Sequence, residues 1–475
     1  MEGDYKITIG LEVHAELKTQ TKMFCGCLNA PDEKNPNTNI CPVCMGYPGT
    51  LPVINKSAVK KVLFVGTALG GELADFTEFD RKNYFYPDIS KGYQISQYKH
   101  PLVSGGELAG VKLTRIHLEE DTARSSHETP GVSLVDYNRA GVPLMELVTE
   151  PVIHSAQETM KFAQELQLLL QYLGVSDANM EKGEMRVEVN ISISKDENFG
   201  TKVEVKNINS FKAAGRAVEY EFERQKSLLE KGEKVVQETR GFDENKGVTF
   251  SQRSKESAHD YRYFPEPDLP KLLLSEIPEF SIEKLKSELP ELPWQKRERY
   301  SKKFGIKSED TEFYINNKSF SEFFEQVISK IKDIKEDVIK LVSNYIISDL
   351  AGLFKSKNEG DIFGKITPDY FAKLVVMNKD GLISSRAVKD ILKIMFEFGG
   401  DPIDIANSNG LMQRSDTDEL KKIVEKIIAD NPNVVDDYKK GKESVLQFFV
   451  GQGMKASRGS ANPEMLKTIF LESLK

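Results

Sequence analysis

The chain has 475 residues, of which 39% are hydrophobic and 29% are charged, the composition of an ordinary globular protein with a sizeable core. At about 100–200 residues per domain, this length predicts two to four domains. The formal net charge of −8 excludes a surface that attracts nucleic acid through global charge, so any such contact requires local basic patches.

The N-terminal segment is predicted to be a half-buried strand. Residues 7–17 alternate, with apolar side chains on one side and Glu12 and His14 on the other. Two potential ligands two residues apart on one strand face can point at the same ion, although a solvent-facing edge also explains the pair. The strand begins without a secretory signal, and no apolar run approaches the ~18 residues of a membrane span. We therefore expect a cytoplasmic protein that does not enter a membrane.

The four cysteines form two closely spaced pairs, Cys25 with Cys27 and Cys41 with Cys44. In a chain without a secretory signal, this pattern favours a structural zinc site over disulfides or a vestigial site. The second pair has the usual two-residue spacing, whereas the first has a single intervening residue. If all four thiols bind zinc, none remains to act as a glutaminase or protease nucleophile.

A helix is predicted over residues 56–69, closed by two glycines, and a loop rich in aromatic residues follows over 80–88. Four of the nine residues in this loop are aromatic or proline. Its cations, Lys82 among them, can meet phosphate or carboxylate groups while the rings hold them in place.

The next predicted strand ends in three consecutive acids, Glu119, Glu120 and Asp121. Because neighbouring acids repel one another, we expect a divalent ion, or else Arg115 and Arg124, to offset the repulsion. Together with the earlier acids and histidines, this stretch indicates a metal-dependent site that handles anions. A hydrated sheet face is the simpler alternative for any single charged residue.

Two further strands carry the remaining candidate binding residues. After an amphipathic helix over 155–173, the segments 185–192 and 202–206 both alternate, and a polar turn pairs them as a hairpin. Alternation alone does not decide whether their polar face meets solvent or lines a cleft. That face carries Arg186, Glu188, Asn190 and Lys206.

A helix over 210–231 and a short strand at 248–250 lead to a second loop rich in proline and aromatic residues, 260–268. The segment 290–293, with two prolines, and the basic run after it mark a predicted domain boundary. The chain beyond this boundary is lysine-rich and predicted to be helical. The fold class is therefore α+β, a β-rich domain followed by all-α parts. We place the domains at residues 1–292, 293–405 and 406–475.

The last segment holds the cations Lys455 and Arg458 near glycines, where they can grip a phosphate backbone or simply form solvated surface. The sequence contains no G-x-x-x-x-G-K-[ST] loop, no G-x-S-x-G elbow and no H-E-x-x-H motif. Nucleotide chemistry in this chain therefore has to use carboxylates, a metal and side-chain cations.

Taken together, the motifs closely resemble the B subunits (GatB) of the tRNA-dependent aspartyl/glutamyl-tRNA(Asn/Gln) amidotransferases. The resemblance spans essentially the whole chain, and the motifs are too long for a chance match. They are Ile9–His14, Phe79–Asp88, Tyr93–Gln97, Leu118–Asp121, Asp260–Asp268, Ser384-Ser-Arg and Gly453–Ser457.

The resemblance implies a ligase that forms carbon–nitrogen bonds with glutamine as the amide donor. Such a subunit uses ATP to phosphorylate the side-chain carboxylate of Glu-tRNA(Gln) or Asp-tRNA(Asn). Ammonia, released by an amidase (A) subunit and delivered through an intersubunit channel, then displaces the phosphate, and a small C subunit completes the heterotrimer. The implied fold is a β-rich cradle, a helical domain and a small tail resembling the YqeY family, the last two helping to hold the tRNA.

By motif, the resemblance makes Glu12, His14, Glu120 and Glu146 the magnesium-site residues and places Lys82 near the mouth of the channel. We infer that Arg186, Glu188, Asn190 and Lys206 line the cleft for the nucleotide or the acceptor end. The cysteines match the zinc-bearing branch of the family, in which the metal is structural. Lys455 and Arg458 are the candidate tRNA contacts of the tail.

Two other functions fit parts of the sequence, a non-catalytic zinc-bearing RNA-binding protein and a free-standing metallohydrolase. The archaeal E-type relative carries an inserted domain for which this chain has no room. The sequence does not specify the aspartyl or glutamyl substrate, the number of metals, the occupancy of the zinc site or the orientation of the tail.

Overall fold

The computed structural model describes residues 5–126, 131–254, 260–332, 334–355, 364–413, 417–439, 442, 444–457 and 461–474. The chain divides into two compact units, Met1–Pro293 (unit 1) and Trp294–Lys475 (unit 2). This division lies one residue beyond the first predicted domain boundary. The mixed sheet of unit 1 and the helical unit 2 confirm the predicted α+β class.

Unit 1 is built around a mixed ten-stranded sheet of order β15-β14-β13-β12-β1-β11-β8-β6-β2, with β7 paired to β8. All neighbouring pairs are antiparallel except β13 and β14. The N-terminal strand therefore lies in the middle of the sheet. The strands are β1 (Lys6–Glu16), β2 (Glu72–Leu73), β6 (Val103–Ser104), β7 (Glu107–Leu108), β8 (Val111–Glu120), β11 (Pro143–Thr149), β12 (Met185–Ser194), β13 (Val203–Lys206), β14 (Glu238–Asp243) and β15 (Val248–Ser254).

Seven short strands form three smaller sheets in unit 1. One sheet pairs β10 with β9, a second has the order β16-β4-β5, and a third pairs β17 with β3. The second sheet joins the two predicted aromatic loops, because Phe264 of β16 lies opposite Arg81 of β4. These strands are β3 (Phe76–Thr77), β4 (Asp80–Asn83), β5 (Tyr93–Ser96), β9 (Arg124–Ser126), β10 (Leu134–Asp136), β16 (Phe264–Pro265) and β17 (Leu272–Leu273).

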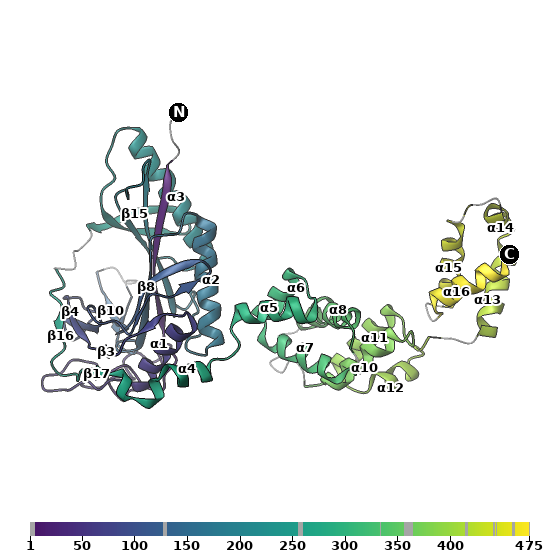
Figure 1. Cartoon of the computed structure of the whole chain (residues 1–475), viewed down its shortest axis with the longest axis horizontal. Helices are drawn as coiled ribbons and strands as arrows, with labels where there is room; N and C mark the ends of the chain where they lie inside the picture. The colour runs from purple at the N-terminus through teal and green to yellow at the C-terminus, as the bar shows by residue number, and fades with distance from the viewer. Residues whose placement is uncertain are drawn as a thin grey trace. The chain divides into compact units, whose positions relative to one another are not determined.

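Helices cover one face of the large sheet, and α2 and α3 lie side by side along it (Figure 1). The apolar residues of β1, such as Leu11 and Val13, are buried in one cluster with residues of α1, α2 and α3. The polar residues of the same strand occupy the opposite face, as the alternation predicted. The helices are α1 (Lys56–Ala68), α2 (Ala156–Tyr172), α3 (Phe211–Glu230), α4 (Ile282–Glu288) and the 3₁₀ turns η1 (Leu274–Glu276) and η2 (Pro278–Phe280).

Side-chain caps explain where these helices begin. Asn55 accepts hydrogen bonds from the amides of Ser57 and Ala58 at the start of α1, and Ser155 and Ser210 do the same for α2 and α3. Each cap satisfies amides that have no partner within the helix. The predicted helices at 56–69, 155–173 and 210–231 are confirmed to within one residue at either end.

Unit 2 is helical throughout its described segments, apart from connecting loops and isolated β-bridges such as that between Ile383 and Met412. It contains two separate hydrophobic clusters, one formed by residues from Tyr300 to Ala406 and the other by residues from Leu420 to Leu474. The predicted boundary between residues 405 and 406 falls within α12, and the division of unit 2 into two domains stays a prediction. The helices are α5 (Pro293–Phe304), α6 (Ser308–Asn316), α7 (Lys318–Lys330), α8 (Glu336–Asn344), the π-helix η3 (Tyr345–Leu350), α9 (Ala351–Lys355), α10 (Pro368–Lys379), α11 (Ser385–Phe398), α12 (Pro402–Ser408), α13 (Thr417–Asp430), α14 (Pro432–Lys439), α15 (Val445–Ala456) and α16 (Pro463–Ser473).

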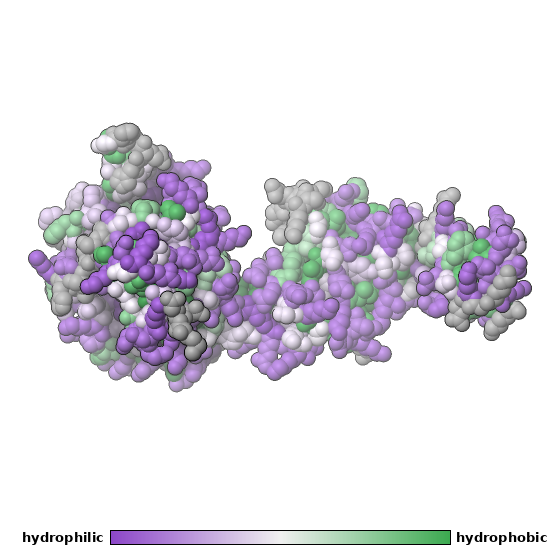
Figure 2. Space-filling view, turned by 90° about the horizontal axis from the view of Figure 1, so that it is seen from above, coloured by the Kyte–Doolittle hydropathy of each residue, from purple (hydrophilic) through white to green (hydrophobic). Residues whose placement is uncertain are grey.

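Hydrophilic residues dominate the face of unit 1 shown in Figure 2, with apolar residues in smaller patches between them. Within the described part of the chain, none of the helices has both the length and the apolar character needed to cross a membrane.

Candidate metal and active site

The register of four neighbouring strands gathers the candidate site on the polar face of the large sheet. His14 of β1 lies opposite Glu146 of β11 on one side and opposite Arg186 of β12 on the other. Glu146 in turn lies opposite His117 of β8. Directly opposed residues of antiparallel strands point to the same face, so these four side chains form one row across the sheet.

Glu146 is the centre of this acid and histidine cluster. Its Oε2 lies 3.3 Å from His14 Nε2 and 3.4 Å from His117 Nε2. The same His14 nitrogen lies 3.8 Å from Glu119 Oε1 and 3.9 Å from Glu12 Oε1. His117, Glu119 and Glu146 are buried, whereas Glu12 retains 27% of its side-chain exposure, so the cluster is reached from the side of Glu12.

The charges in the cluster depend strongly on one another. Burial, together with the negative charge of Glu146, raises the pKa of Glu12 to about 7. Burial disfavours the charged imidazolium of His14, but the hydrogen bond and charge of Glu146 outweigh it and raise the pKa of His14 to about 9. Burial likewise opposes ionisation of Glu146, yet His117 and His14 hold the pKa of Glu146 well below its usual range. Glu146 is thus the fixed negative charge that organises its neighbours.

Three sets of side chains on this face can each hold a cation, because the ligand atoms within each set lie within 4.8 Å of one another. Carboxylate oxygens, joined by one imidazole nitrogen in two of the sets, suit divalent ions such as Mg²⁺ or Mn²⁺, so these donors fit the predicted metal. Glu146 belongs to two of the sets and Glu12 to two. The sets are Glu12, His14 and Glu146; His117, Glu119 and Glu146; and Glu12, Glu188 and Glu204.

The structure brings together three of the four predicted magnesium residues, Glu12, His14 and Glu146, but not Glu120. Glu120 shares the core-facing side of β8 with Leu118, and its Oε1 pairs with Lys91 and accepts a hydrogen bond of 2.9 Å from the Ile95 amide. His117 and Glu119 face the cluster instead. The alternation of β8 could have identified Glu119. Residues two apart on a strand share a face, so a strand that points His117 to the polar face also points Glu119 there.

Lys82 of β4 approaches the same cluster from the smaller sheet. The negative charges of Glu119 and Glu146 outweigh the burial of Lys82 and raise its pKa, so this lysine stays protonated. Its Nζ lies 5.2 Å from the centre of the Tyr261 ring, a cation–π contact. The two aromatic loops therefore meet around a cation that faces the acids.

The four predicted cleft residues extend the same polar face beyond the cluster. Glu188 lies opposite Glu12 and forms an ion pair of 2.8 Å with Lys206, and Asn190 lies opposite Glu204. The predicted antiparallel pairing of these two strands is confirmed. The remaining predicted residue, Arg186, lies next to His14 in the row of side chains that crosses the sheet.

The cations expected to offset the three consecutive acids, Arg115 and Arg124, were the wrong ones. Asp121 Oδ2 lies 3.1 Å from Arg186 Nη2 and 3.6 Å from Arg139 Nε, and these two cations overcome burial to lower the pKa of Asp121 to about 2. Arg124 pairs with Asp32 at 3.5 Å and Arg115 reaches only Glu146, at 3.9 Å. The true partners come from other strands and loops.

The four cysteines converge at a single point, because their sulfur atoms all lie within 4.8 Å of one another. All four are free thiols, so they form no disulfide with one another. A hydrogen bond with the Cys25 thiol lowers the pKa of Cys44 to about 5, which favours a thiolate. Four converging sulfurs with a thiolate among them fit tetrahedral zinc.

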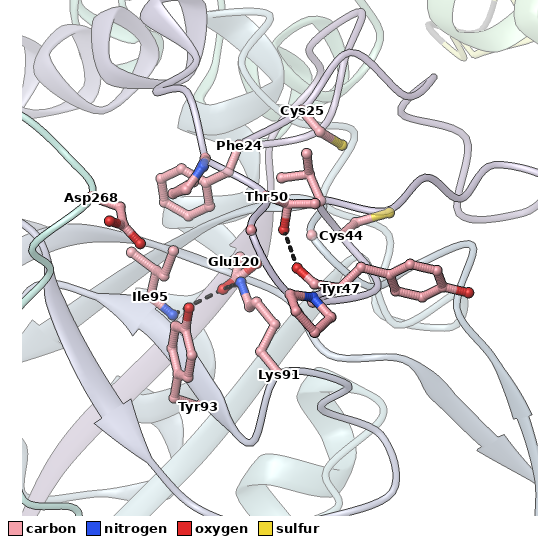
Figure 3. Close-up of a pocket in the computed structure, with 16 residues that line it drawn as sticks. Phe24, Cys25, Cys44, Tyr47, Thr50, Lys91, Tyr93, Ile95, Glu120 and Asp268 are labelled. Atoms are coloured by element: carbon pink, nitrogen blue, oxygen red, sulfur yellow. Dashed lines mark hydrogen bonds and ion pairs between the residues drawn. The ribbon is translucent and has the colours of Figure 1, made fainter.

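Beside the cysteines lies a cavity of about 230 Å³, lined by Cys25 and Cys44 on one side and by Lys91, Tyr93 and Glu120 on the other (Figure 3). Gly141 borders it with a positive φ of 84°, and a Cβ there would lie 3.6 Å from Cys44 Cβ and 3.9 Å from Glu120 Oε2. The cavity therefore lies between the predicted zinc loop and Glu120, the predicted magnesium residue that does not join the cluster on the polar face.

Comparison with known proteins identifies the chain. A family model described as the GatB/GatE catalytic domain matches residues 7–278, and one described as the GatB domain of the YqeY type matches residues 322–474. The chain belongs to the GatB family.

Curated relatives support this over the full length. The B subunit of the aspartyl/glutamyl-tRNA(Asn/Gln) amidotransferase of Moorella thermoacetica is 45% identical, over 99% of this chain and all of the relative. Proteins of the same name from Persephonella marina and a Thermoanaerobacter species are 44% and 43% identical, each over 99% of this chain and at least 99% of the relative. The predicted resemblance is confirmed. All five residues of the acid and histidine cluster lie within the segment that matches the GatB/GatE catalytic domain.

The raised pKa values of this GatB chain predict how its stability depends on pH. A folded-state pKa above the ordinary value gives stability that is complete below the ordinary pKa and lost as pH rises through the folded one. For Glu12, this loss of stability extends to about pH 7, and for His14 it extends to about pH 9. For Glu16, whose pKa is raised by burial and by the charge of Asp121, it extends to about pH 8. In buffer without divalent metal, we expect the thermal midpoint of unfolding to fall between about pH 5 and 8; above that range the lowered pKa of Cys44, which adds stability as pH rises, offsets the remaining loss at His14. Replacing Glu12 with Gln should flatten the lower part of that fall, and a midpoint that rises across this range would contradict the assignment.

Proposed function

We propose that this chain is the B subunit of a tRNA-dependent amidotransferase. In the first step, a side-chain carboxylate oxygen of Glu-tRNA(Gln) or Asp-tRNA(Asn) attacks the γ-phosphorus of ATP, and ADP leaves. Ammonia then attacks the acyl carbon of the resulting acyl phosphate, inorganic phosphate leaves, and the product is Gln-tRNA(Gln) or Asn-tRNA(Asn). The names of the relatives and the catalytic domain that the chain matches support this reading over a non-catalytic RNA-binding protein.

The observation that carries the proposal is the cluster around Glu146, which lies within reach of both His14 and His117. Phosphoryl transfer needs charge neutralisation more than covalent help from the protein. We propose that Glu12, His14 and Glu146 hold Mg²⁺, with Glu119 and His117 beside it. When bound, such an ion neutralises charge on the transferring phosphoryl group. Glu120 contacts Lys91 instead and belongs to a different part of the catalytic domain.

The cations on the polar face have distinct roles in this proposal. Lys82 carries its charge next to Glu119 and Glu146, so it can meet an incoming phosphate at the metal site. Arg186 and Lys206, paired with Asp121 and Glu188, lie on neighbouring strands of the same face. We propose that they and Asn190 bind ATP or the acceptor end, because charge-assisted hydrogen bonds to phosphates are strong.

The partners follow from what the chain lacks. The four cysteine sulfurs converge in one cluster, and if all four bind zinc, no thiol remains to act as a nucleophile in glutamine hydrolysis. We propose that an amidase (A) subunit supplies ammonia and that a C subunit completes a heterotrimer. Lys455, on α15, is a candidate tRNA contact, and the second candidate, Arg458, lies outside the described residues.

We further propose that the cysteine cluster holds a structural zinc ion. Replacing Cys41 with Ser removes one of four ligands and is expected to lower the zinc content of the purified chain from about one equivalent to near zero. Atomic emission spectroscopy of the purified variant measures this directly. A Ser57→Ala variant, which alters an exposed residue of α1, serves as the control and should keep its zinc. Wild-type protein without zinc would refute the site.

The proposed activity is tested by reconstitution. The purified chain is combined with its amidase and C subunits, and formation of amidated aminoacyl-tRNA is measured with each of the two misacylated tRNAs. We expect product only when ATP, Mg²⁺, tRNA and this chain are all present, and the tRNA that is converted gives the specificity. Amidation without this chain would refute the proposal, and ATP turnover equally fast without tRNA would favour a metallohydrolase.

A further inference from the structure

Lys91 and Glu120 form an ion pair in which both side chains are almost completely buried, with exposed fractions of 9% and 4%. The Glu120 oxygen that meets Lys91 also accepts a hydrogen bond from the Ile95 amide at 2.9 Å. A buried ion pair repays the cost of removing its charges from water only when both partners are held in good geometry. Glu120 is fixed by β8, but Lys91 lies in the loop between β4 and β5, so something else must hold it.

The cysteine knuckle, defined here as residues 41–46, holds this loop through two contacts. Ser90 Oγ, directly before Lys91, donates a hydrogen bond of 2.9 Å to the carbonyl oxygen of Cys44. Gly46, which has a φ of +68°, leaves room for Lys91, because a Cβ at this position would lie 2.5 Å from Lys91 Cγ and 3.0 Å from Lys91 Cα. The backbone of Lys91 therefore lies directly against the knuckle.

Figure 3 shows Cys44, Lys91 and Glu120 around the same cavity. A movement of the knuckle consequently changes both the place of the lysine ammonium and the shape of the cavity wall. A zinc ion bound to the cysteines would fix the sulfur atoms of Cys41 and Cys44, which lie 3.9 Å apart. The rings of Phe24 and Tyr93 also face the Lys91 ammonium, at 5.8 and 5.4 Å from its Nζ to the ring centres.

We propose that the knuckle positions Lys91 against Glu120, with Ser90 and Gly46 as the positioning residues. The role of the metal in this positioning rests on the proposed zinc site, whereas the contacts of Ser90 and Gly46 do not. The cysteine loop, which is itself part of the catalytic domain, thereby sets the position of one buried lysine of that domain.

The test is the reactivity of Lys91 toward a water-soluble amine-acylating reagent, measured by peptide mass spectrometry on the full chain. Ser90→Ala removes the hydrogen bond to the knuckle, and Gly46→Ala forces a Cβ onto Lys91. We expect each variant to raise Lys91 labelling by roughly three- to tenfold. The Lys91 side chain would then spend more time away from Glu120, in rotamers that expose its amine to the reagent. Ser90→Thr, which keeps the hydroxyl, should restore the wild-type rate.

The matched control is Gly49→Ala. Gly49 also has a positive φ, +83°, and lies in the same loop, but a Cβ there would meet nothing within 4 Å. This variant carries the same backbone strain and should leave Lys91 labelling unchanged. Lys206, which is paired with Glu188 and lies on β13, is the internal reference for general loosening of the fold.

Removing the metal with a chelator should raise Lys91 labelling in the wild-type chain as well, with the zinc content measured in parallel. A chain that holds no zinc refutes the metal site alone, since the Ser90 and Gly46 variants still decide the positioning. Unchanged Lys91 labelling in both variants would overturn the proposal. An equal rise at Lys206, or in Gly49→Ala, would also overturn it.

Discussion

Replacing Glu146 with Gln is expected to lower ATP-dependent amidation by about 10²–10³-fold. Glu146 is the one carboxylate shared by two of the three cation sets that also contacts both histidines, at 3.3 Å from His14 and 3.4 Å from His117. The substitution keeps the shape and removes the charge that sustains the raised pKa of His14. The reconstituted amidation assay at saturating tRNA measures the loss, and Mg²⁺ binding measured by calorimetry should weaken in parallel.

Glu150→Gln is the control for this substitution. Glu150 follows the same strand, but its carboxylate accepts a hydrogen bond of 2.7 Å from Thr114, which a Gln side chain can also accept. Its activity should stay within about twofold of wild type. If Glu146→Gln kept its activity, or if both variants lost it equally, the cluster would not be the metal site.

The largest expected loss of stability comes from a different part of unit 1, the fully buried Glu221 of α3. Its carboxylate pairs with Arg224 at 2.9 Å and with Arg240 of β14 at 3.1 Å, and accepts a hydrogen bond from Thr249 of β15. Glu221→Ala removes the buried carboxylate that joins Arg224 to Arg240 and leaves these two partly buried cations with Glu238 as their remaining acidic neighbour, which costs about 3 kcal/mol. The thermal midpoint of unit 1 should fall by roughly 5–15 °C.

Differential scanning calorimetry of the full chain measures this fall. Glu223→Ala provides the comparison, because Glu223 is exposed on the same helix and its loss should shift the midpoint by no more than ~1–2 °C. A midpoint unchanged by Glu221→Ala would mean that the guanidinium groups find other acceptors and that this buried network does not join α3 to the sheet edge.

Much of the fold could be predicted because local rules decide it. Asn55, Ser155 and Ser210 cap the three helices of unit 1 that the sequence predicts, and β1 follows the predicted alternation. The candidate site residues of β1 and β12 were proposed for the same reason, since a period of two places Glu12 with His14 on one face of β1 and Arg186 with Glu188 on one face of β12.

The errors arose where the answer depends on contacts between distant segments. The pattern of charges near Asp121 gave no sign that Arg139 and Arg186 would neutralise it, because they lie on a separate loop and strand. The motif that contains Glu119 and Glu120 likewise did not reveal which of the two reaches the cluster. If His117 is known to face the cluster, the period of two within β8 shows that Glu119 faces it too. The pairing of Glu120 with Lys91 is visible only in the tertiary structure.

The central place of β1 also has a consequence for how the protein is made. This strand pairs with β11 and β12, so after its own synthesis it has no complete set of partners until the chain has been made to about residue 194. At about 5–20 residues per second, that delay lasts roughly 10–40 s. During this time an apolar strand is available for wrong pairings, so we expect the nascent chain to require a chaperone such as a ribosome-bound holdase more than its final stability suggests.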